Sequence, residues 1–376
     1  MRLASATGLL VLASLAAACK SAPSAPDDTG IKNRLAALGV EGRTYVHDLG
    51  ATSSILVHAI HQAGDDFLVE DVHGHLTYVD GATLNVRWEF YGLPGTFSHV
   101  PSFTPSAVIG MSKGYLYVLT RSAGVPEPQP RWLELIPSAA PVATDSTAYI
   151  PTYPTPAGNR TVYAVSLGSG YLGWGARTSG DVVSNMAKGG PGAGDTVYFG
   201  TTTGALVAYP ADLASERDPE VAWATHAQSG IRFDLVVDGD DLGVVTEDGR
   251  LICYDRVTGN PRWEAYPDAG QYGESPAQFS SEMAFYRRAG ALYAFDRATG
   301  APKWKVPHAT RYLAQRGNRV IVAADGGMVY SVDATTGEVG HRCRFPGVTI
   351  LPQPQKDATV TAVTDRGLCV AVEFGW

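Results

Sequence analysis

Charged residues, cysteine and long apolar runs are all scarce in this sequence. Only 18% of the 376 residues are charged, and 29 basic against 37 acidic residues leave a formal charge of −8. Proteins that bind nucleic acid need a basic surface, so the composition argues against that class. The sequence has no block of like charge that would form a polybasic membrane segment. Long helical periodicity is also absent, whereas 42 glycines and 18 tyrosines fit short strands and tight turns.

The N-terminus has the features of an export signal. Met1-Arg2 is a short basic start, and the uncharged apolar run 6–18 is too short to span a bilayer. It ends in Leu15-Ala16-Ala17-Ala18-Cys19, which resembles the lipobox of bacterial lipoproteins. The resemblance implies a signal peptide over 1–18 and an acylated Cys19. An ordinary signal peptide that ends near a cysteine is the alternative.

The next segment, 19–41, is predicted to be a tether. Residues 20–30 are small, polar and proline-rich, and Ile31, Leu35 and Leu38 have the spacing of a short helix. Lys20 is not the aspartate associated with inner-membrane retention, so the resemblance favours the outer membrane, facing the periplasm.

Three further cysteines would face an oxidising compartment after export. Cys253 and Cys369 occupy strand positions where other copies of the repeat described below have Ala, Tyr or Val, so we expect buried small hydrophobes there. A Cys343–Cys369 disulfide stays open, because spacing alone does not support it.

An eleven-residue unit recurs along the rest of the chain. Ala294 to Trp304 (AFDRATGAPKW) is almost repeated at Cys253 to Trp263 (CYDRVTGNPRW). Each copy predicts a strand that ends at Asp, a Thr-Gly turn, and a second strand that carries Trp. Asp can cap the turn by accepting backbone N–H groups, and Trp suits a contact between packed sheets. The expected caps are Asp80, Asp255, Asp296 and Asp333.

The Asp-type positions give the number of units. They are spaced 37 to 46 residues apart and lie at 80, 120, 166, 210, 255, 296, 333 and 373. This is the period of a four-stranded propeller blade. The last unit lacks an outer strand, and 42–49 is a strand without a hairpin before it. We therefore predict an all-β, eight-bladed β-propeller over 42–376, with the last blade closed by the N-terminal strand. Seven blades is the alternative.

The pattern A-x-D-x-x-T-G-x-x-x-W resembles the repeat of the PQQ-type β-propellers. This family includes quinoprotein alcohol dehydrogenases and the BamB-type lipoproteins of outer-membrane β-barrel assembly. In it the tryptophans dock blade against blade, which implies that structural role for Trp88, Trp132, Trp174, Trp223, Trp263 and Trp304. His341 stands where the seventh copy would have Trp, and the sequence offers no account of it.

Residues that could support catalysis or bind a metal have structural explanations in this sequence. The dehydrogenases of the family carry adjacent cysteines, and this chain has none. Four histidines lie in the first unit. A strand over 66–72 would be roughly 23 Å long, which predicts that His58 and His61 lie at its opposite end from His73 and His75. We therefore expect no metal, cofactor or catalytic residue.

These observations favour a non-enzymatic lipoprotein of the bacterial envelope. The resemblance implies a BamB-like scaffold that binds protein partners, such as a β-barrel assembly complex, through loops between blades. A propeller that binds a glycan or small molecule is the alternative, and a PQQ-dependent oxidoreductase is the least favoured reading.

Overall fold

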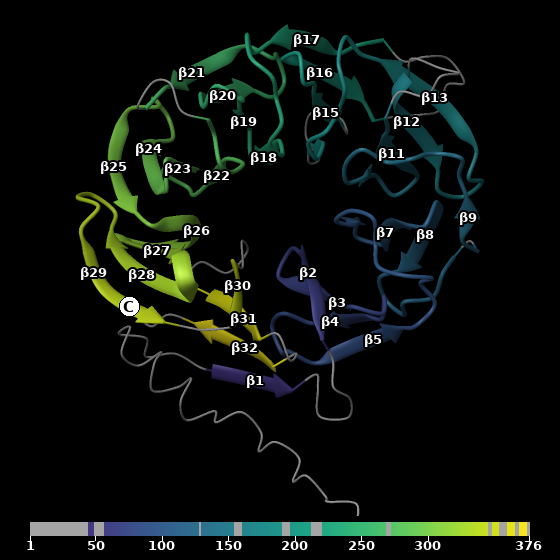
Figure 1. Ribbon diagram of the computed structural model, residues 1–376, viewed down its shortest axis with the longest axis horizontal. Helices are drawn as coiled ribbons and strands as arrows, with labels where there is room; N and C mark the ends of the chain where they lie inside the picture. The colour runs from purple at the N-terminus through teal and green to yellow at the C-terminus, as the bar shows by residue number, and fades with distance from the viewer. Residues whose placement is uncertain are drawn as a thin grey trace, which may run out of the picture.

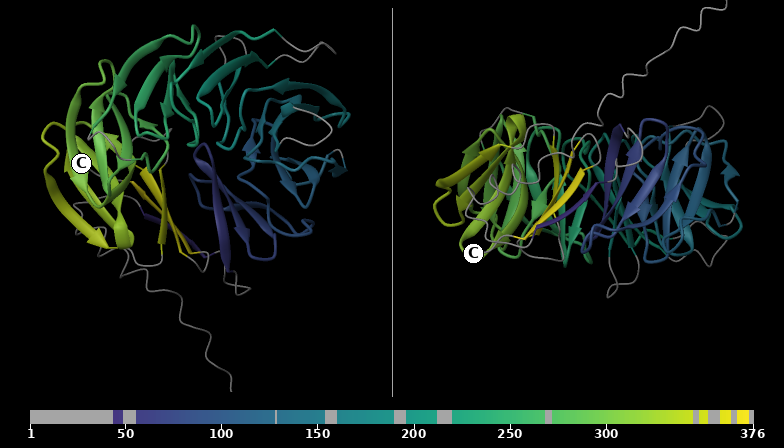
Figure 2. Two further views of the ribbon diagram at one scale, coloured as in Figure 1. Left: turned by 45° about the horizontal axis from the view of Figure 1, so that its top comes forward. Right: turned by 90° about the horizontal axis from the view of Figure 1, so that it is seen from below.

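In the computed structural model of the chain, the described residues form eight antiparallel sheets of four strands each. The structure describes residues 44–48, 56–127, 129–153, 160–189, 196–211, 220–267, 272–344, 348–352, 359–364 and 368–373. The sheets stand around a ring in Figure 1, and the ring is a disc when seen from the side in Figure 2. The predicted all-β propeller is confirmed, and the number of sheets equals the number of predicted units.

Each blade is one sheet, and its strands are given from the centre of the ring to the rim. Blade 1 is β2 (Val57–Ala63), β3 (Asp66–Asp71), β4 (Leu76–Val79) and β5 (Val86–Phe90). Blade 2 is β6 (Ser102–Phe103), β7 (Ala107–Ser112), β8 (Tyr115–Thr120) and β9 (Arg131–Trp132). Blade 3 is β10 (Val142–Ala143), β11 (Thr147–Pro151), β12 (Arg160–Ser166) and β13 (Leu172–Arg177). Blade 4 is β14 (Ala187–Lys188), β15 (Thr196–Gly200), β16 (Ala205–Pro210) and β17 (Trp223–His226).

The second half of the chain continues in the same order. Blade 5 is β18 (Val236–Asp238), β19 (Asp241–Val245), β20 (Leu251–Asp255) and β21 (Pro261–Ala265). Blade 6 is β22 (Gln278–Phe279), β23 (Met283–Arg288), β24 (Ala291–Asp296) and β25 (Pro302–Pro307). Blade 7 is β26 (Ala309–Arg316), β27 (Arg319–Ala324), β28 (Met328–Asp333) and β29 (Val339–Arg344). Blade 8 is β30 (Val348–Pro352), β31 (Thr359–Thr364), β32 (Leu368–Glu373) and β1 (Thr44–Asp48).

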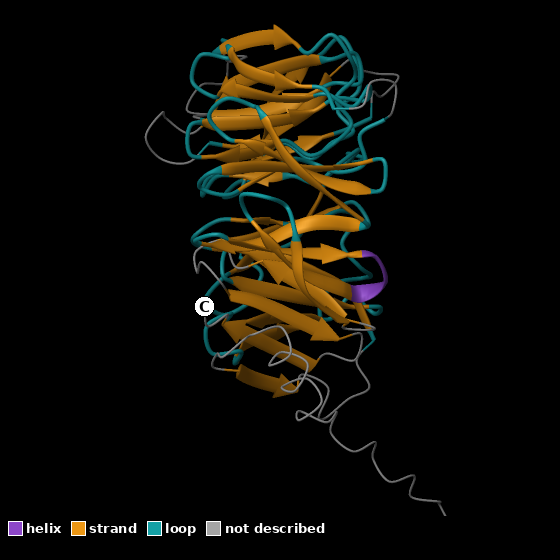
Figure 3. Ribbon diagram, turned by 90° about the vertical axis from the view of Figure 1, so that its left-hand side faces the viewer, coloured by secondary structure: helices purple, strands orange, loops and turns teal. Residues whose placement is uncertain are grey.

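Apart from strands, the described chain consists of loops, turns and one 3₁₀ turn, η1 (Asp325–Gly327), as Figure 3 shows. Within these ranges no helix combines the length and apolar character that a membrane span requires.

Burial explains why the sequence alternates in some strands and not in others. All residues of β3, β7 and β19 are buried, because the second strand of a blade is covered by sheets on both sides. The outer strand β25 instead alternates, with Trp304 and Val306 buried and Lys303 and Lys305 exposed. An outer strand therefore has one face in the ring and one face in water.

The antiparallel order gives the disc two distinct faces. The hairpin between the second and third strands of a blade lies on the same face as the connection to the next blade. We call this the hairpin face. The Asp-x-x-Thr-Gly turns, between third and fourth strands, lie on the other face, which we call the turn face. Asp255 shows the cap geometry, since its Oδ1 accepts the backbone N–H groups of Val257 (3.0 Å) and Thr258 (2.9 Å). Asp80, Asp296 and Asp333 do the same in their turns.

The N-terminal strand completes blade 8, as the sequence predicted. β1 pairs antiparallel with β32, from Thr44 opposite Val372 to Asp48 opposite Leu368. The first described residue, Thr44, therefore lies at the turn face.

Successive blades meet at seams, and a tryptophan of one blade contacts the turn of the next. The indole Nε1 donates a hydrogen bond to the carbonyl oxygen of the residue that follows the Asp-type position. The pairs are Trp88 with Arg121 (2.8 Å), Trp223 with Arg256 (3.0 Å), Trp263 with Arg297 (2.7 Å) and Trp304 with Ala334 (2.8 Å). One residue type thus closes four seams with the same bond.

Glycine is required where the indole crosses the turn. Gly300 has φ +71°, and a Cβ built there would lie 2.6 Å from the indole of Trp263. Gly124, Gly259 and Gly337 stand in the same relation to Trp88, Trp223 and Trp304. The Thr-Gly of the repeat is therefore a docking surface as well as a turn.

Trp174 closes its seam differently. It is buried, but its Nε1 has no hydrogen-bond partner among the described residues. The carbonyl of Ala211, which follows the Asp-type position of blade 4, instead accepts the hydroxyl of Tyr149 at 2.7 Å. Trp174 packs against Tyr149 and Tyr209, so its contribution is apolar contact.

We predict that Gly300→Ala destabilises the ring much more than Gly290→Ala. Both glycines have left-handed φ, at +71° and +68°, but nothing lies within 4 Å of a Cβ at Gly290. The backbone strain alone costs about 1 kcal/mol, and overpacking against Trp263 adds about 2 kcal/mol. Urea unfolding of both variants measures the difference, and equal losses would contradict the docking role of the turn.

Candidate interaction surface

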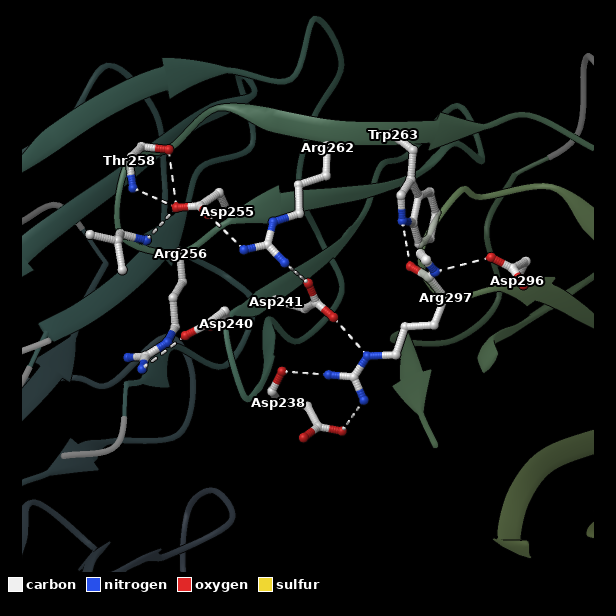
Figure 4. A network of polar contacts seen from close by, with 12 residues as sticks. Asp238, Asp240, Asp241, Asp255, Arg256, Thr258, Arg262, Trp263, Asp296 and Arg297 are labelled. Carbon is white, nitrogen blue, oxygen red and sulfur yellow. Dashed lines mark hydrogen bonds and ion pairs between the residues drawn. The ribbon is translucent and has the colours of Figure 1, made fainter. Parts of the chain in front are cut away.

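A chain of ion pairs runs through the seam between blades 5 and 6 (Figure 4). Arg262 on β21 contacts Asp255 (2.6 Å) and Asp241 (2.7 Å), and Asp241 also accepts the Nε–H of Arg297 from blade 6 (2.7 Å). Arg297 further contacts Asp238 at 3.2 Å. Alternating charges therefore connect two blades at the turn face.

The same arrangement recurs between blades 1 and 2. Asp66 contacts Arg87 (3.4 Å) and Arg121 (3.2 Å), and Arg87 contacts Asp80 (2.5 Å). This seam lies four blades from the other one, across the ring. Open clefts of about 420 and 460 Å³ lie over the networks of blades 1–2 and 5–6, respectively.

The network beneath the cleft of blades 5–6 holds one of its carboxyl groups in the ionised form. The hydrogen bond from Arg262, followed by those from Thr258, lowers the pKa of Asp255 to about 2. A carboxyl group held ionised in this way is a poor general acid at neutral pH. Cys253 lies below the same network, where burial, with a smaller contribution from Asp241, raises the pKa of its thiol to about 12. Cys253 is therefore a buried, protonated thiol, in agreement with the prediction of a buried small residue at this position.

We predict that Arg262→Gln destabilises the protein at neutral pH and that the difference from the wild type shrinks in acid. A carboxyl whose pKa is lowered by folding contributes stability above its unfolded pKa of about 4 and loses it as the pH falls towards its folded pKa of about 2. Urea midpoints of both proteins at several pH values across this window measure the effect. A difference that stays constant would contradict the pairing.

The histidines of blade 1 are placed differently from the prediction. Val57 pairs with Asp71, so His58 lies at the same end of the sheet as His73 and His75, and the prediction for His58 was wrong. β2 begins at the hairpin face and runs towards the turn face, so its first residues lie beside the end of β3. The sequence alone did not indicate where this strand begins. His61 is separate and buried, with its Nε2 2.9 Å from Glu70. Among the described residues no group of three or more His, Cys, Asp or Glu could hold a metal ion.

Trp132 departs from the expected docking role. It pairs with Tyr115, at the hairpin end of β8, whereas Trp263 and Trp304 pair two residues before the Asp of their blades. The longer, proline-rich segment between the turn and Trp132 moves the indole to the other end of the strand. Its side chain is 59% exposed, and it packs edge-to-face on Tyr115 with ring centroids 5.2 Å apart.

Other exposed apolar side chains lie near Trp132 on the hairpin face. Ile136 follows Trp132 in the connection to blade 3, and its carbonyl accepts the backbone N–H of Tyr153 at 3.3 Å. His99 Nε2 lies 3.2 Å from the carbonyl oxygen of Pro137, which brings the connection that carries Val100 alongside. These five residues are 39% to 68% exposed, and we call them the aromatic surface: Val100, Tyr115, Trp132, Ile136 and Tyr153.

On the other side of the ring the hairpin face carries charged side chains. Over blades 5 to 7 it carries ion pairs, namely Arg232–Glu247 (3.1 Å), Arg287–Glu274 (3.2 Å) and Arg287–Asp325 (3.3 Å). Exposed Trp, Tyr and Ile side chains gathered in one place are typical of protein interfaces. The aromatic surface is therefore the candidate binding site.

Three features considered from the sequence lie outside what the structure describes, namely the acylated Cys19, a short helix and a Cys343–Cys369 disulfide. Cys19 and the expected helix at 31–38 precede the first described residue, and the side chains of Cys343 and Cys369 are not described.

Comparison with known families identifies the repeat. The family model described as "Outer membrane protein assembly factor BamB" matches residues 158–287 and 288–373, more than half of the chain. The chain belongs to the BamB family. A comparison with curated protein sequences finds no match.

Several solved structures have folds similar to that of this chain. BamB from Moraxella catarrhalis superposes with a TM-score of 0.63 at 16% identity, over 88% of this chain and 98% of that one. The computationally designed Ika8 protein gives 0.59 at 16% identity, over 89% and 98%. Quinohemoprotein alcohol dehydrogenase from Comamonas testosteroni gives 0.58 at 12% identity, over 92% and 78%. At these identities the likeness establishes the fold alone, which a BamB protein and an alcohol dehydrogenase share.

Proposed function

We propose that this BamB-family chain is a non-enzymatic scaffold of the bacterial envelope. In this proposal residues 1–18 are a lipoprotein signal peptide, 19–41 an acylated Cys19 with its tether, and 42–376 the propeller. The anchor holds the chain at the outer membrane, facing the periplasm, and the propeller binds an outer-membrane protein assembly complex. The match to the BamB family model supports this role.

The aromatic surface is the proposed contact with that partner. Trp132 and Ile136 are large apolar side chains that remain 59% and 68% exposed, although the fold buries the equivalent tryptophans of blades 5 and 6. Leaving such groups in water is unfavourable, and a partner that covers them recovers about 25 cal/mol per Å² of apolar area. Val100 and Ile136 lie on connections between blades, whereas Tyr115 and Trp132 lie on strands β8 and β9 of blade 2.

We predict that Trp132→Ser combined with Ile136→Ser reduces crosslinking to the β-barrel assembly complex by at least about tenfold, as expected for residues at the centre of an interface. The measurement is crosslinking in intact cells, followed by purification of the chain and quantification of the partner. The control is Tyr171→Ser combined with Val257→Ser, which removes apolar side chains that are 64% and 55% exposed at the turn face. Equal crosslinking in both variants would contradict the assignment.

We predict that Cys19→Ala moves the protein from the membrane fraction to the soluble periplasmic fraction, because acylation is the proposed anchor. Fractionation with immunodetection measures it. A variant that stays in the membrane fraction after a high-salt wash would refute the lipid anchor.

A further inference from the structure

The outer strands of the blades carry an uneven distribution of charge. In blades 1 and 5 the residues on either side of the seam tryptophan have opposite charges, and in blade 6 both are positive. The pairs are Arg87 and Glu89, Arg262 and Glu264, and Lys303 and Lys305. The outer strand of blade 6 therefore carries two positive residues where those of blades 1 and 5 carry one of each sign.

Blade 7 extends this positive rim. Arg342 and Arg344 on β29 are exposed. Arg342 lies over the ring of Tyr330 (5.4 Å) as Lys305 lies over the ring of Tyr293 (5.7 Å), and each cation pairs with its tyrosine in the strand register. Adjacent blades thus present a cation at equivalent positions.

A third strand adds to the same region. Arg319 on β27 lies 3.5 Å from His341, the residue that stands at the tryptophan position of blade 7. We call the following five residues the basic rim: Lys303, Lys305, Arg319, Arg342 and Arg344. Between Glu282 and Arg344 the sequence has ten basic and five acidic residues, although the whole chain carries a charge of −8. The residues are dispersed in the sequence, and folding gathers them on two blades.

The chain enters the propeller next to this rim. β1 is the outer strand of blade 8, and blade 8 packs against blade 7 through β30 and β26 (Figure 1). Thr44 begins β1, and only residues 20–43 separate it from Cys19. A membrane that holds Cys19 therefore has blade 8 as the nearest part of the described ring, and blade 7, which carries part of this rim, is one of the two neighbours of blade 8.

We propose that the basic rim binds the anionic phospholipid headgroups of the membrane to which the chain is anchored. The proposal rests on the lipid anchor of the proposed function. Lys and Arg side chains close to an anionic bilayer are attracted to it, and several together orient the protein. The cations stand on two separate sheets, so an extended anionic surface can contact them all. An acidic strand that pairs with β25 cannot also pair with β29, which favours the bilayer over an acidic protein segment.

Vesicle binding of the full chain that carries Cys19→Ala tests this without the acyl group. The probes are vesicles of phosphatidylglycerol with phosphatidylethanolamine, and vesicles of phosphatidylcholine alone. We expect binding to the anionic vesicles to exceed binding to phosphatidylcholine and to fall at high salt. The phosphatidylcholine arm measures any binding by the apolar N-terminal run, which all variants share.

Lys305→Glu combined with Arg342→Glu should weaken binding to the anionic vesicles by at least about tenfold. Lys303 is left in place because it lies 3.5 Å from Asp296. The matched control is Lys113→Glu combined with Arg177→Glu, which makes the same change in net charge at exposed positions of blades 2 and 3. Circular dichroism checks that both variants are folded.

Two outcomes would overturn the proposal. One is an equal loss of vesicle binding in the rim variant and the control, which would mean that only net charge matters. The other is binding of polyglutamate without any preference for anionic vesicles, which would assign the rim to an acidic protein. None of these residues belongs to the aromatic surface. A failure of the vesicle experiment can therefore be distinguished from a failure of the crosslinking experiment.

Discussion

A tryptophan indole lying on the glycine of the next blade's turn is the contact on which the ring depends. It requires three things at once: a left-handed turn without Cβ, a carbonyl aimed at Nε1, and an outer strand in the register that delivers the indole. Blades 5 and 6 each supply the turn for one neighbour and the indole for the other, so a change at one of these seams affects both partners. This reciprocity explains why Asp, Thr-Gly and Trp recur together in the sequence.

Elements fixed by local contacts could be predicted from the sequence, and elements fixed by register could not. The strand predicted to end at Asp296 is β24, because the Asp-capped Thr-Gly turn that follows it is a local feature. Trp132 was assigned to a seam because its residue type fits the repeat. Only the pairing of β8 with β9 shows that the inserted prolines carry it to the opposite face.

Long-range polar contacts were equally out of reach. Asp66 and Asp241 stand apart from the repeat, and nothing in their neighbourhoods indicates an arginine of the next blade. Blades 1 and 5 share the network because each combines an Asp at the start of its second strand with an Arg before Trp, followed by an Arg in the next turn. Blade 6 has Met283 at the first of these positions, opposite Asp296, and its seam has no such carboxylate.

Departures from the repeat are therefore the places where the chain was free to acquire function. Where the ring closes, Leu84 takes the left-handed position of the turn, at φ +59°, and is fully buried, while Tyr45 occupies the tryptophan register in β1. Trp132 and His341, by contrast, stand at or near tryptophan positions of the repeat and remain exposed. They lie on blades 2 and 7, on opposite sides of the ring in Figure 1. If the basic rim rests on the membrane, the aromatic surface is turned away from it, and a partner can bind without displacing the anchor.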